Sequence, residues 1–405
     1  MARVSRLSSS RIAITAVGCV TPLGESLEET FAALIRGESG VGPIQNFDAT
    51  GFPVTFAAEL KTRPKMDQGR LKLHLTEVCW RQMVQQIGDT PLPERIGVCV
   101  GSEAARPDLQ DFATRMRSNE PPLLEELQRN AADAPARWLA EEVGATGSVS
   151  TISTACTSSS QAIGEGFLRI QRGEVDAMIV GGVDVLVGPL MVTGFSLLGA
   201  LSSRNDDPEA ASRPFDKDRD GFVLGEGAGF LLLETEESAA RAGRKPLGEL
   251  SGYGCSCNAW RITDSPPDGR GAAQSMEAAL ETAGIGPADV GYINAHGTST
   301  GMNDPSESAG IQRVFGEHTM DVPVSSSKSM MGHLVAACGA VEALVCLEVV
   351  REGQIPMTLN LENPDPNCPV RHVRGAPLKS TVRHALSNAF GFGGSNGSLV
   401  VSAWD

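Results

Sequence analysis

The chain lacks an excess of basic residues and has no paired-cysteine motif, and each shortage excludes a class of function. Lysine and arginine number 34 against 49 aspartates and glutamates, a formal net charge of −15, so the basic face that nucleic-acid binding requires is missing. None of the nine cysteines forms a C-x-x-C pair, and Cys255 and Cys257 have no cluster nearby to complete a zinc site. We interpret most of these thiols as buried apolar residues in a reducing compartment, the cytoplasm.

The sequence also shows no secretory signal, no dinucleotide-binding fingerprint and no uninterrupted membrane span. Residues 177–201 form the most apolar stretch, which is long enough for a transmembrane helix. Asp184 and Pro189 interrupt it, so two buried segments joined by a turn fit better. We therefore expect no membrane segment, no redox cofactor and no metal.

At 405 residues the chain exceeds the usual limit of roughly 250–300 residues for a single core, which predicts two core units. Strand-like and helix-like segments alternate, as is typical of α/β layers with mostly parallel strands. We place the boundary near residue 250, giving units 1–250 and 251–405, and interpret residues 102–145 as a surface or interface excursion. Expected strands are 12–17, 96–101, 148–153, 177–180, 250–253, 290–294, 322–326 and 399–402; expected helices are 60–86, 157–171, 272–283, 306–315 and 334–350.

Cys156 lies between a predicted strand and a predicted helix, among small residues. At a helix N-terminus the macrodipole and free N–H groups favour the thiolate and lower the thiol pKa. The same N–H groups can receive a developing oxyanion. Cys156 is therefore a candidate nucleophile, although a buried cysteine that only packs in a strand-to-helix turn has the same local pattern.

Two histidines share this kind of setting. His296 directly follows a strand, and His333 lies between a strand and a helix, each beside glycine and hydroxyl residues. The carboxyl ends of strands are where open α/β sheets place ligands. Either histidine alone could be an ordinary hydrogen-bonding residue, but two of them with a cysteine turn suit acyl transfer followed by decarboxylation. The thiolate would take the acyl group, and two imidazole N–H donors would stabilise the enolate left when CO2 departs.

Four ordered motifs extend this set, and with them the chain from about Ile12 to its end resembles the β-ketoacyl-[acyl carrier protein] synthase family. The similarity is to the synthase II type of fatty acid synthesis and its type II polyketide relatives. The motifs are Thr154-Ala-Cys-Thr-Ser158, Asn294-Ala-His-Gly-Thr-Ser-Thr300, Lys328-Ser-Met-Met-Gly-His333 and Asn388-Ala-Phe-Gly-Phe-Gly-Gly-Ser-Asn-Gly397, with support from Ser212-Arg-Pro-Phe-Asp216 and Asp220-Gly-Phe-Val-Leu-Gly-Glu-Gly227.

The resemblance implies a thiolase-type α/β fold, with two similar halves in a five-layered αβαβα core. The half at 1–250 would carry the nucleophilic cysteine and the half at 251–405 the two histidines. It also implies an acyl carrier protein as partner, whose phosphopantetheine carries the substrates. A homodimer is expected, since the excursion at 102–145 needs something to pack on. A heterodimer with a related ketosynthase-like subunit is the other possibility.

The resemblance assigns roles residue by residue. Cys156 would accept the acyl group, and His296 and His333 would bind the extender thioester and assist decarboxylation. The backbone N–H groups of Cys156 and Phe392 would form the oxyanion hole. Lys328 would set the local electrostatics, and Glu342 would tie the site together, with a structural cation near it left open. Thr298 and Thr300 would contact the phosphopantetheine arm. Phe392 would gate the acyl channel, and Phe390 would contact the substrate.

Two departures from the family pattern leave the substrate and partner open. Housekeeping members have a glycine-rich stretch where this chain reads Glu103-Ala-Ala-Arg-Pro-Asp108, and an arginine used for carrier docking is missing from Leu198-Gly-Ala-Leu-Ser202. The basic stretch Lys61, Arg63, Lys65 and Arg70 is therefore our candidate for carrier docking, against a solvated helix face as the alternative.

Related activities fit the site residues less well. A thiolase would use a second cysteine, and a chain-initiating synthase would have asparagine in place of His333. A non-catalytic chain-length subunit would have lost Cys156. We therefore expect an elongating, decarboxylating acyltransferase of a polyketide, polyene or fatty acid pathway.

Overall fold

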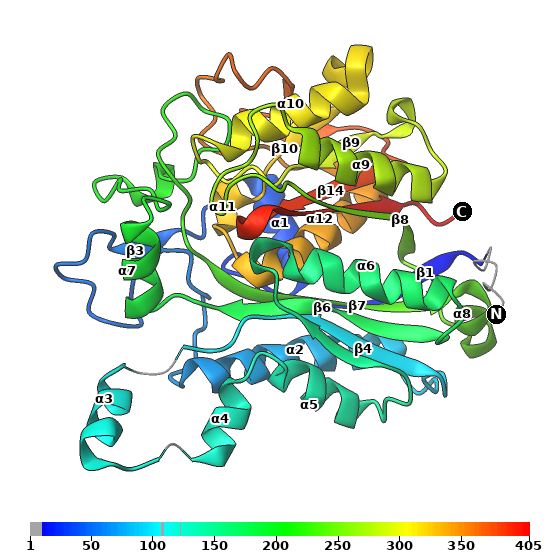
Figure 1. Cartoon of the computed structure of the whole chain (residues 1–405). Helices are drawn as coiled ribbons and strands as arrows, with labels where there is room; N and C mark the ends of the chain where they lie inside the picture. Colours follow the sequence, from blue (N-terminus) through cyan, green and yellow to red (C-terminus); the bar gives the residue numbers. More distant parts are fainter. Residues whose placement is uncertain (1–9, 107–108, 122) are drawn as a thin grey trace.

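The computed structural model describes residues 10–106, 109–121 and 123–405 and shows layers of helices and strands (Figure 1). Strands β1 (Ile12–Val20), β4 (Ile96–Gly101), β5 (Val149–Ile152), β6 (Ala177–Val185) and β7 (Glu226–Thr235) form the first half of the main sheet. Their order is β5-β4-β6-β7-β1. The first three run parallel, and β7 is antiparallel to both β6 and β1.

A second set of strands repeats this pattern. It contains β8 (Gly248–Cys257), β9 (Tyr292–Asn294), β10 (Pro323–Ser325), β12 (Arg371–His372), β14 (His384–Phe390) and β15 (Ser395–Ser402), in the order β12-β10-β9-β14-β15-β8. Four strands are parallel, and β15 is antiparallel to β14 and β8. The two sets meet where β1 pairs with β8, so they form one 11-stranded sheet.

Helices complete five layers. Helices α6 (Ser158–Gln171) and α12 (Cys338–Glu352) form the middle layer, since each contacts strands of both sets. Helix α2 (Gln68–Ile87) covers β1, β6 and β7 from the outside, and α9 (Arg270–Ala283), joined by α10 (Asn303–Phe315), covers β8 and β15. The expected αβαβα arrangement of two similar halves is therefore confirmed.

The hydrophobic core is divided by these layers rather than by the halves of the chain. One cluster surrounds α6 and α12 and takes residues from both strand sets, including Val180, Leu231, Leu344 and Leu399. Two further clusters lie beneath α2 and beneath α9. The halves pack face to face and share the central cluster, so the core units of the two halves are continuous. The boundary at residue 250 stays a prediction.

Several predicted elements match the structure. The strand at 96–101 is β4, and the helices at 157–171 and 272–283 correspond to α6 and α9. Ser26 caps α1 (Leu27–Arg36), accepting the Glu29 N–H at 3.1 Å. The helix expected at 60–86 begins only at Gln68, with Asp67 as its N-cap. Strands β7 and β14 were not predicted, because both are almost wholly buried and show no alternation of polar and apolar residues.

The remaining elements are short. They are β2 (Gly42–Pro43), β3 (Phe56–Ala57), α3 (Leu109–Ser118), α4 (Leu124–Asn130), α5 (Ala134–Glu142), α7 (Pro189–Leu197), α8 (Glu236–Ala242), α11 (Lys328–Met331), β11 (Gln354–Ile355) and β13 (Leu378–Lys379). Helices α3 and α4, within the predicted excursion, stand out from the lower edge of the molecule (Figure 1).

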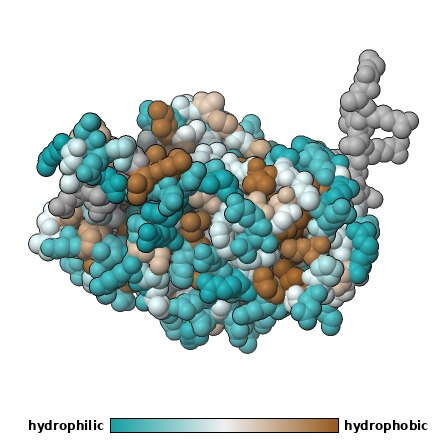
Figure 2. All heavy atoms as spheres, turned by 90° about the horizontal axis from the view of Figure 1, so that it is seen from below, coloured by the Kyte–Doolittle hydropathy of each residue, from teal (hydrophilic) through white to brown (hydrophobic). Residues whose placement is uncertain are grey.

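The surface seen from below is mostly hydrophilic, with separate hydrophobic patches (Figure 2). Phe112, Met116 and Leu124 are exposed apolar residues of α3 and α4. Among the described residues, no helix is long and apolar enough to cross a membrane. The stretch 177–201 instead forms β6 and α7, two segments joined by a turn, as expected.

Candidate active site

Cys156 lies in a single 3₁₀ turn, Ala155–Thr157, between β5 and the start of α6. This is the predicted strand–turn–helix setting. The residue before it, Ala155, has a φ of 52°, a left-handed conformation that costs a non-glycine residue of order 1–3 kcal/mol. The turn is braced from within, since the Ser158 hydroxyl donates to Ala155 O at 2.6 Å and accepts the Thr154 N–H at 2.9 Å.

The sulfur of Cys156 faces hydrogen-bond donors in a buried setting. The backbone N–H groups of Phe392 and of Cys156 itself approach it, and His333 Nε2 lies 3.0 Å from Sγ. Burial nevertheless raises the pKa of the Cys156 thiol to about 12, and the Lys328 charge and the two N–H groups only partly oppose this rise. The lowered thiol pKa expected from the helix terminus is therefore wrong for this closed site, because desolvation outweighs the donors.

His333 is oriented by its own turn. The Val335 N–H points at His333 Nδ1 at 3.3 Å, so Nδ1 accepts and the proton of the neutral ring is on Nε2. Burial, followed by the Lys328 charge, lowers the pKa of His333 well below its usual value. The ring is therefore neutral at physiological pH and presents an N–H donor towards the sulfur.

His296 stands beside His333, with ring centroids 5.4 Å apart and planes at 82°. Burial, then Lys328 and His333, lowers the pKa of His296 well below its usual value, so it is neutral as well. Its backbone N–H donates to Glu307 Oε1 at 2.9 Å, and the Gly297 N–H donates to Oε2 at 2.8 Å.

Sequence reasoning missed Glu307 altogether. It is only 1% exposed, and burial raises its pKa to about 7. A carboxylate in the first turns of the predicted helix at 306–315 gave no signal that it would fold back onto the His296 turn. Only the contact between α10 and the end of β9 shows it.

Lys328 and Glu342 form a buried ion pair behind the two histidines, with side chains 1% and 0% exposed. Burial alone would lower the pKa of Lys328, but neighbouring negative groups, Glu342 first, raise it above its usual value, so the ammonium persists. Nearby polar atoms find no protein partner in the described part of the chain: His296 Nδ1, Glu342 Oε2, Ser327 Oγ and both side-chain amide atoms of Asn294. Buried groups of this kind are normally satisfied by water or an ion.

A cavity of about 230 Å³ leads from the surface to Cys156 and both histidines. Apolar rings line its inner part: Phe222 packs edge-on against His333 at 5.2 Å, and Phe390 lies 5.7 Å from His296. Phe392 also lines it, at the start of the turn Phe392–Gly394. Gly393 and Gly394, with φ of 84° and 82°, give this turn backbone conformations that a side chain would strain.

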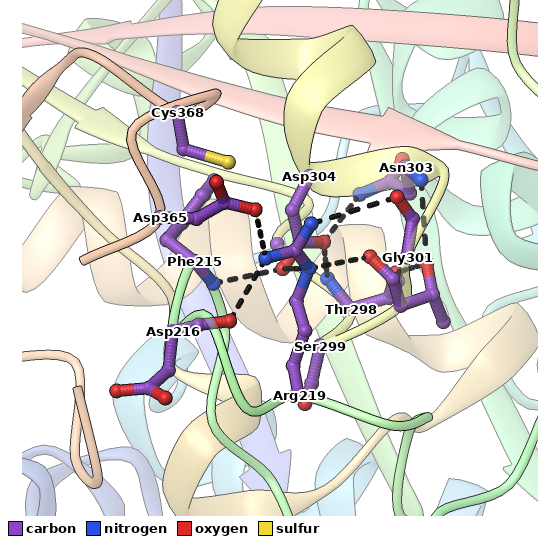
Figure 3. A network of polar contacts seen from close by, with 12 residues as sticks. Phe215, Asp216, Arg219, Thr298, Ser299, Gly301, Asn303, Asp304, Asp365 and Cys368 are labelled. Carbon is purple, nitrogen blue, oxygen red and sulfur yellow. Dashed lines mark hydrogen bonds and ion pairs between the residues drawn. The ribbon is translucent and has the colours of Figure 1, made fainter. Parts of the chain in front are cut away.

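Thr298 and Thr300 line the outer part of the cavity, with hydroxyl oxygens 2.9 Å apart. Figure 3 shows the buried network that supports their loop. Arg219 donates to Thr300 O at 2.8 Å and pairs with Asp365 at 2.7 Å. Asp304 accepts the Thr298 N–H at 3.1 Å. The structure thus brings every predicted catalytic and substrate-binding residue to one cavity or its immediate support.

The predicted carrier-docking stretch is only partly available. Arg63 pairs with the buried Glu226 at 2.7 Å, whereas Arg70 pairs with Asp67 at 3.2 Å but keeps a side chain that is 64% exposed. Lys61 and Lys65 are exposed and line a separate groove of about 840 Å³. Because α2 begins at Gln68, the first three basic residues lie in a loop, and their description as a helix face is wrong.

Comparison with known proteins agrees with this geometry. The β-ketoacyl synthase N-terminal domain model matches residues 9–239, and the C-terminal domain model matches residues 247–362. A 3-oxoacyl-[acyl-carrier-protein] synthase 2 of Synechocystis is 40% identical, covering 98% of this chain and 99% of the relative.

Two solved structures cover nearly the whole chain. A type II polyketide ketosynthase in complex with its acyl carrier protein has a TM-score of 0.87 at 30% identity, covering 98% of this chain and 100% of that one. The ketosynthase ApeO of Xenorhabdus doucetiae, in complex with its chain length factor, has a TM-score of 0.82 at 30% identity, covering 98% of both chains. With a cysteine and two neutral histidines at one cavity and matches along its length, the chain belongs to the β-ketoacyl synthase family.

Proposed function

We propose that the enzyme elongates acyl chains by decarboxylative condensation, with Cys156, His296 and His333 as its catalytic residues. The observation that carries this is the 3.0 Å approach of His333 Nε2 to Cys156 Sγ, with His296 alongside. A thiol nucleophile next to two N–H donors in a buried cavity suits formation of a thioester followed by formation of an enolate.

The first step transfers the acyl group. Cys156 loses its proton, Sγ attacks the thioester carbonyl of the acyl carrier, and the carrier thiol leaves and takes up a proton. The N–H groups of Cys156 and Phe392 stabilise the oxyanion, and the Lys328 charge favours the thiolate. Because burial disfavours the thiolate, we infer that binding of the substrate supplies part of the free energy needed to form it.

The second step removes CO2 from a malonyl thioester. The bond to the carboxylate breaks, and its electron pair forms an enolate whose oxygen accepts from the Nε2–H of His333 and from His296. The enolate carbon attacks the Cys156 thioester, and the sulfur leaves as a thiolate and regains a proton. Neutral imidazoles suit this step, since their N–H groups stabilise the enolate oxygen by hydrogen bonds but are too weakly acidic to protonate the enolate.

The surrounding residues position the substrate. Thr298 and Thr300 hold the phosphopantetheine arm at the outer part of the cavity, Phe392 gates the inner part and Phe390 contacts the acyl chain. Lys328 and Glu342 maintain the electrostatics of the histidine pair. This chemistry requires neither a redox cofactor nor a metal, and the free thiols of all nine cysteines suit a reducing, cytoplasmic setting.

We propose two partners. The first is an acyl carrier protein docking near Lys61 and Lys65. The second is another copy of this chain, paired through β5. This strand lies at the end of the main sheet, and Val149 on it is 44% exposed. Such an edge offers unpaired backbone groups to a second strand.

Cys156→Ala should abolish condensation without unfolding the protein, because the small turn accommodates alanine. Initial rates with an acyl carrier and malonyl carrier, together with intact mass of the acylated enzyme, test this. Cys19→Ala is the matched control, since Cys19 is a buried cysteine of β1 and should leave turnover intact. A stable acyl adduct on Cys156→Ala would contradict the assignment.

His296→Ala and His333→Ala should still acylate at Cys156 but lose CO2 release from the malonyl thioester. Each missing oxyanion donor costs about 2.7–4 kcal/mol, a loss of roughly 10²–10³-fold. Labelled CO2 release measures this directly, with His384→Ala as a control for a histidine bonded to Ser402 instead. Decarboxylation at the wild-type rate by either variant would remove that histidine from the mechanism.

Lys61→Glu with Lys65→Glu should raise KM for the carrier by roughly two- to thirtyfold and leave kcat almost unchanged, since exposed charge pairs contribute about 0.2–1 kcal/mol each. The effect should be largest at low salt. Lys245→Glu reverses an exposed lysine elsewhere and should leave KM unchanged. An unchanged KM for the double variant at low salt would eliminate this groove as the docking site.

The protein should be a dimer at micromolar concentration, and Val149→Lys should shift it towards monomer by placing a charge on the β5 edge. Light scattering on both proteins measures this, and Val84→Lys, at an exposed position of α2, is the control. A monomeric wild-type protein would rule out the homodimer, and restoration of a dimer by a related subunit would indicate a heterodimer.

A further inference from the structure

Lys72 is a buried cation that lies outside the catalytic set. Lys72, on the inner face of α2, is only 2% exposed. Its Nζ donates to the backbone oxygen of Glu103, just beyond the end of β4. A fully buried lysine is rare unless it is paired, because removing an ammonium from water is costly. The groups around the Lys72 ammonium therefore indicate its role.

The first group around Lys72 is Glu103, which contacts the turn that carries Cys156. Glu103 Oε1 accepts the Ala155 N–H at 3.3 Å and the Ser153 hydroxyl at 2.8 Å. Ala155 is the residue with a φ of 52° immediately before Cys156. Lys72 thus binds the backbone of Glu103, and the Glu103 carboxylate binds the strained turn before Cys156.

The second group is Asp184, which contacts the turn that follows His333. Asp184, on β6, is fully buried, and its Oδ2 accepts the Ala336 N–H at 3.0 Å. Ala336 follows Val335, which has a φ of 45° and whose N–H sets the tautomer of His333. The two catalytic turns are thus built alike, each with a left-handed residue and each held by a carboxylate.

The charges around Lys72 depend on one another. Burial lowers the pKa of Lys72, against the charges of Asp184 and Glu103, while Arg106 adds to the lowering. Burial raises the pKa of Asp184 to about 6, against the charge of Lys72, and Glu103 adds to the rise. Cys156 is a further titratable group near Asp184. Removing Lys72 would leave Asp184 buried without a counter-charge, which favours its neutral form, whereas removing Asp184 would leave Lys72 with Glu103.

We propose that Lys72 is a positioning residue whose buried ammonium, bonded to Glu103 and close to Asp184, holds the turn that carries Cys156 and the turn that follows His333 in their positions. This inference rests on the catalytic roles proposed for Cys156 and His333. Lys72 itself touches no substrate, and its effect on the reaction passes through the two carboxylates.

The rate of condensation should depend on pH through Asp184. Asp184 is ionised above a pH of about 6, and a protonated carboxyl is a weaker acceptor for the Ala336 N–H. The condensation rate should therefore fall as pH drops through about 6. Lys72→Met removes the charge that keeps the pKa of Asp184 down. The pKa of Asp184 should then rise by roughly one unit or more, as expected for loss of a nearby opposite charge. The acid limb, which is the pH range in which the rate falls on the acidic side of the profile, should move to higher pH with it.

The experiment compares pH profiles of kcat, from pH 5 to 9, for the wild type, Lys72→Met, Lys72→Met with Asp184→Asn, and Arg244→Met. Arg244 is a matched control, because it forms a buried ion pair with Glu234 between β7 and the loop before β8. Its loss should lower the melting temperature without moving the acid limb. Adding Asp184→Asn should abolish the shifted limb, since the asparagine side chain does not titrate over this pH range.

Different outcomes would contradict the positioning role of Lys72 and the catalytic role of Cys156. An acid limb at the wild-type position in Lys72→Met, or an equal shift in Arg244→Met, would overturn the positioning role. If Lys72→Met does not fold, Asp184→Asn alone is decisive: it should remove the limb near pH 6, and its persistence would overturn the proposal and leave Glu307 as its source. Condensation by Cys156→Ala would instead refute the catalytic assignment itself.

Discussion

The close crossing of α6 and α12 between the two strand sets is the constraint on which the site depends. A Cβ atom at Gly339 would lie 2.8 Å from the backbone of Ser160, so glycine is required where the helices meet. The turn carrying Cys156 leads into α6, and the turn after His333 leads into α12. Crossing at this point brings together two residues separated by 177 positions, with their reactive atoms 3.0 Å apart.

Burial produced by this packing then sets the chemistry. It makes both histidines neutral donors, and it makes the thiolate difficult to form, against the effect of the helix terminus. The same burial requires that each charge beneath the site has a counter-charge, as in Lys328 with Glu342 and Lys72 with Asp184. The reactive groups and their supports are thus parts of one desolvated polar system.

Much of the fold followed from local patterns. The strand predicted at 96–101 is β4, and the helix predicted at 157–171 is α6, whose buried face carries Ile163, Phe167 and Ile170. Strands β7 and β14 were missed because they are buried on both sides, so their residues do not alternate. The start of α2 was placed too early because the charged residues of 61–65 suit a helix surface, whereas Arg63 turns inward to Glu226.

The sequence by itself determined the reactive residues and the strand–turn–helix setting of Cys156, because these depend on residue type and on neighbours within a few positions. Only the tertiary structure decided the tautomer of His333, the direction of the thiol pKa shift and the contacts of Glu307 and Lys72 with the turns of the site. Each of these depends on how much water is excluded and on which distant backbone groups approach. Such quantities arise from contacts across layers, which no local pattern of residues encodes.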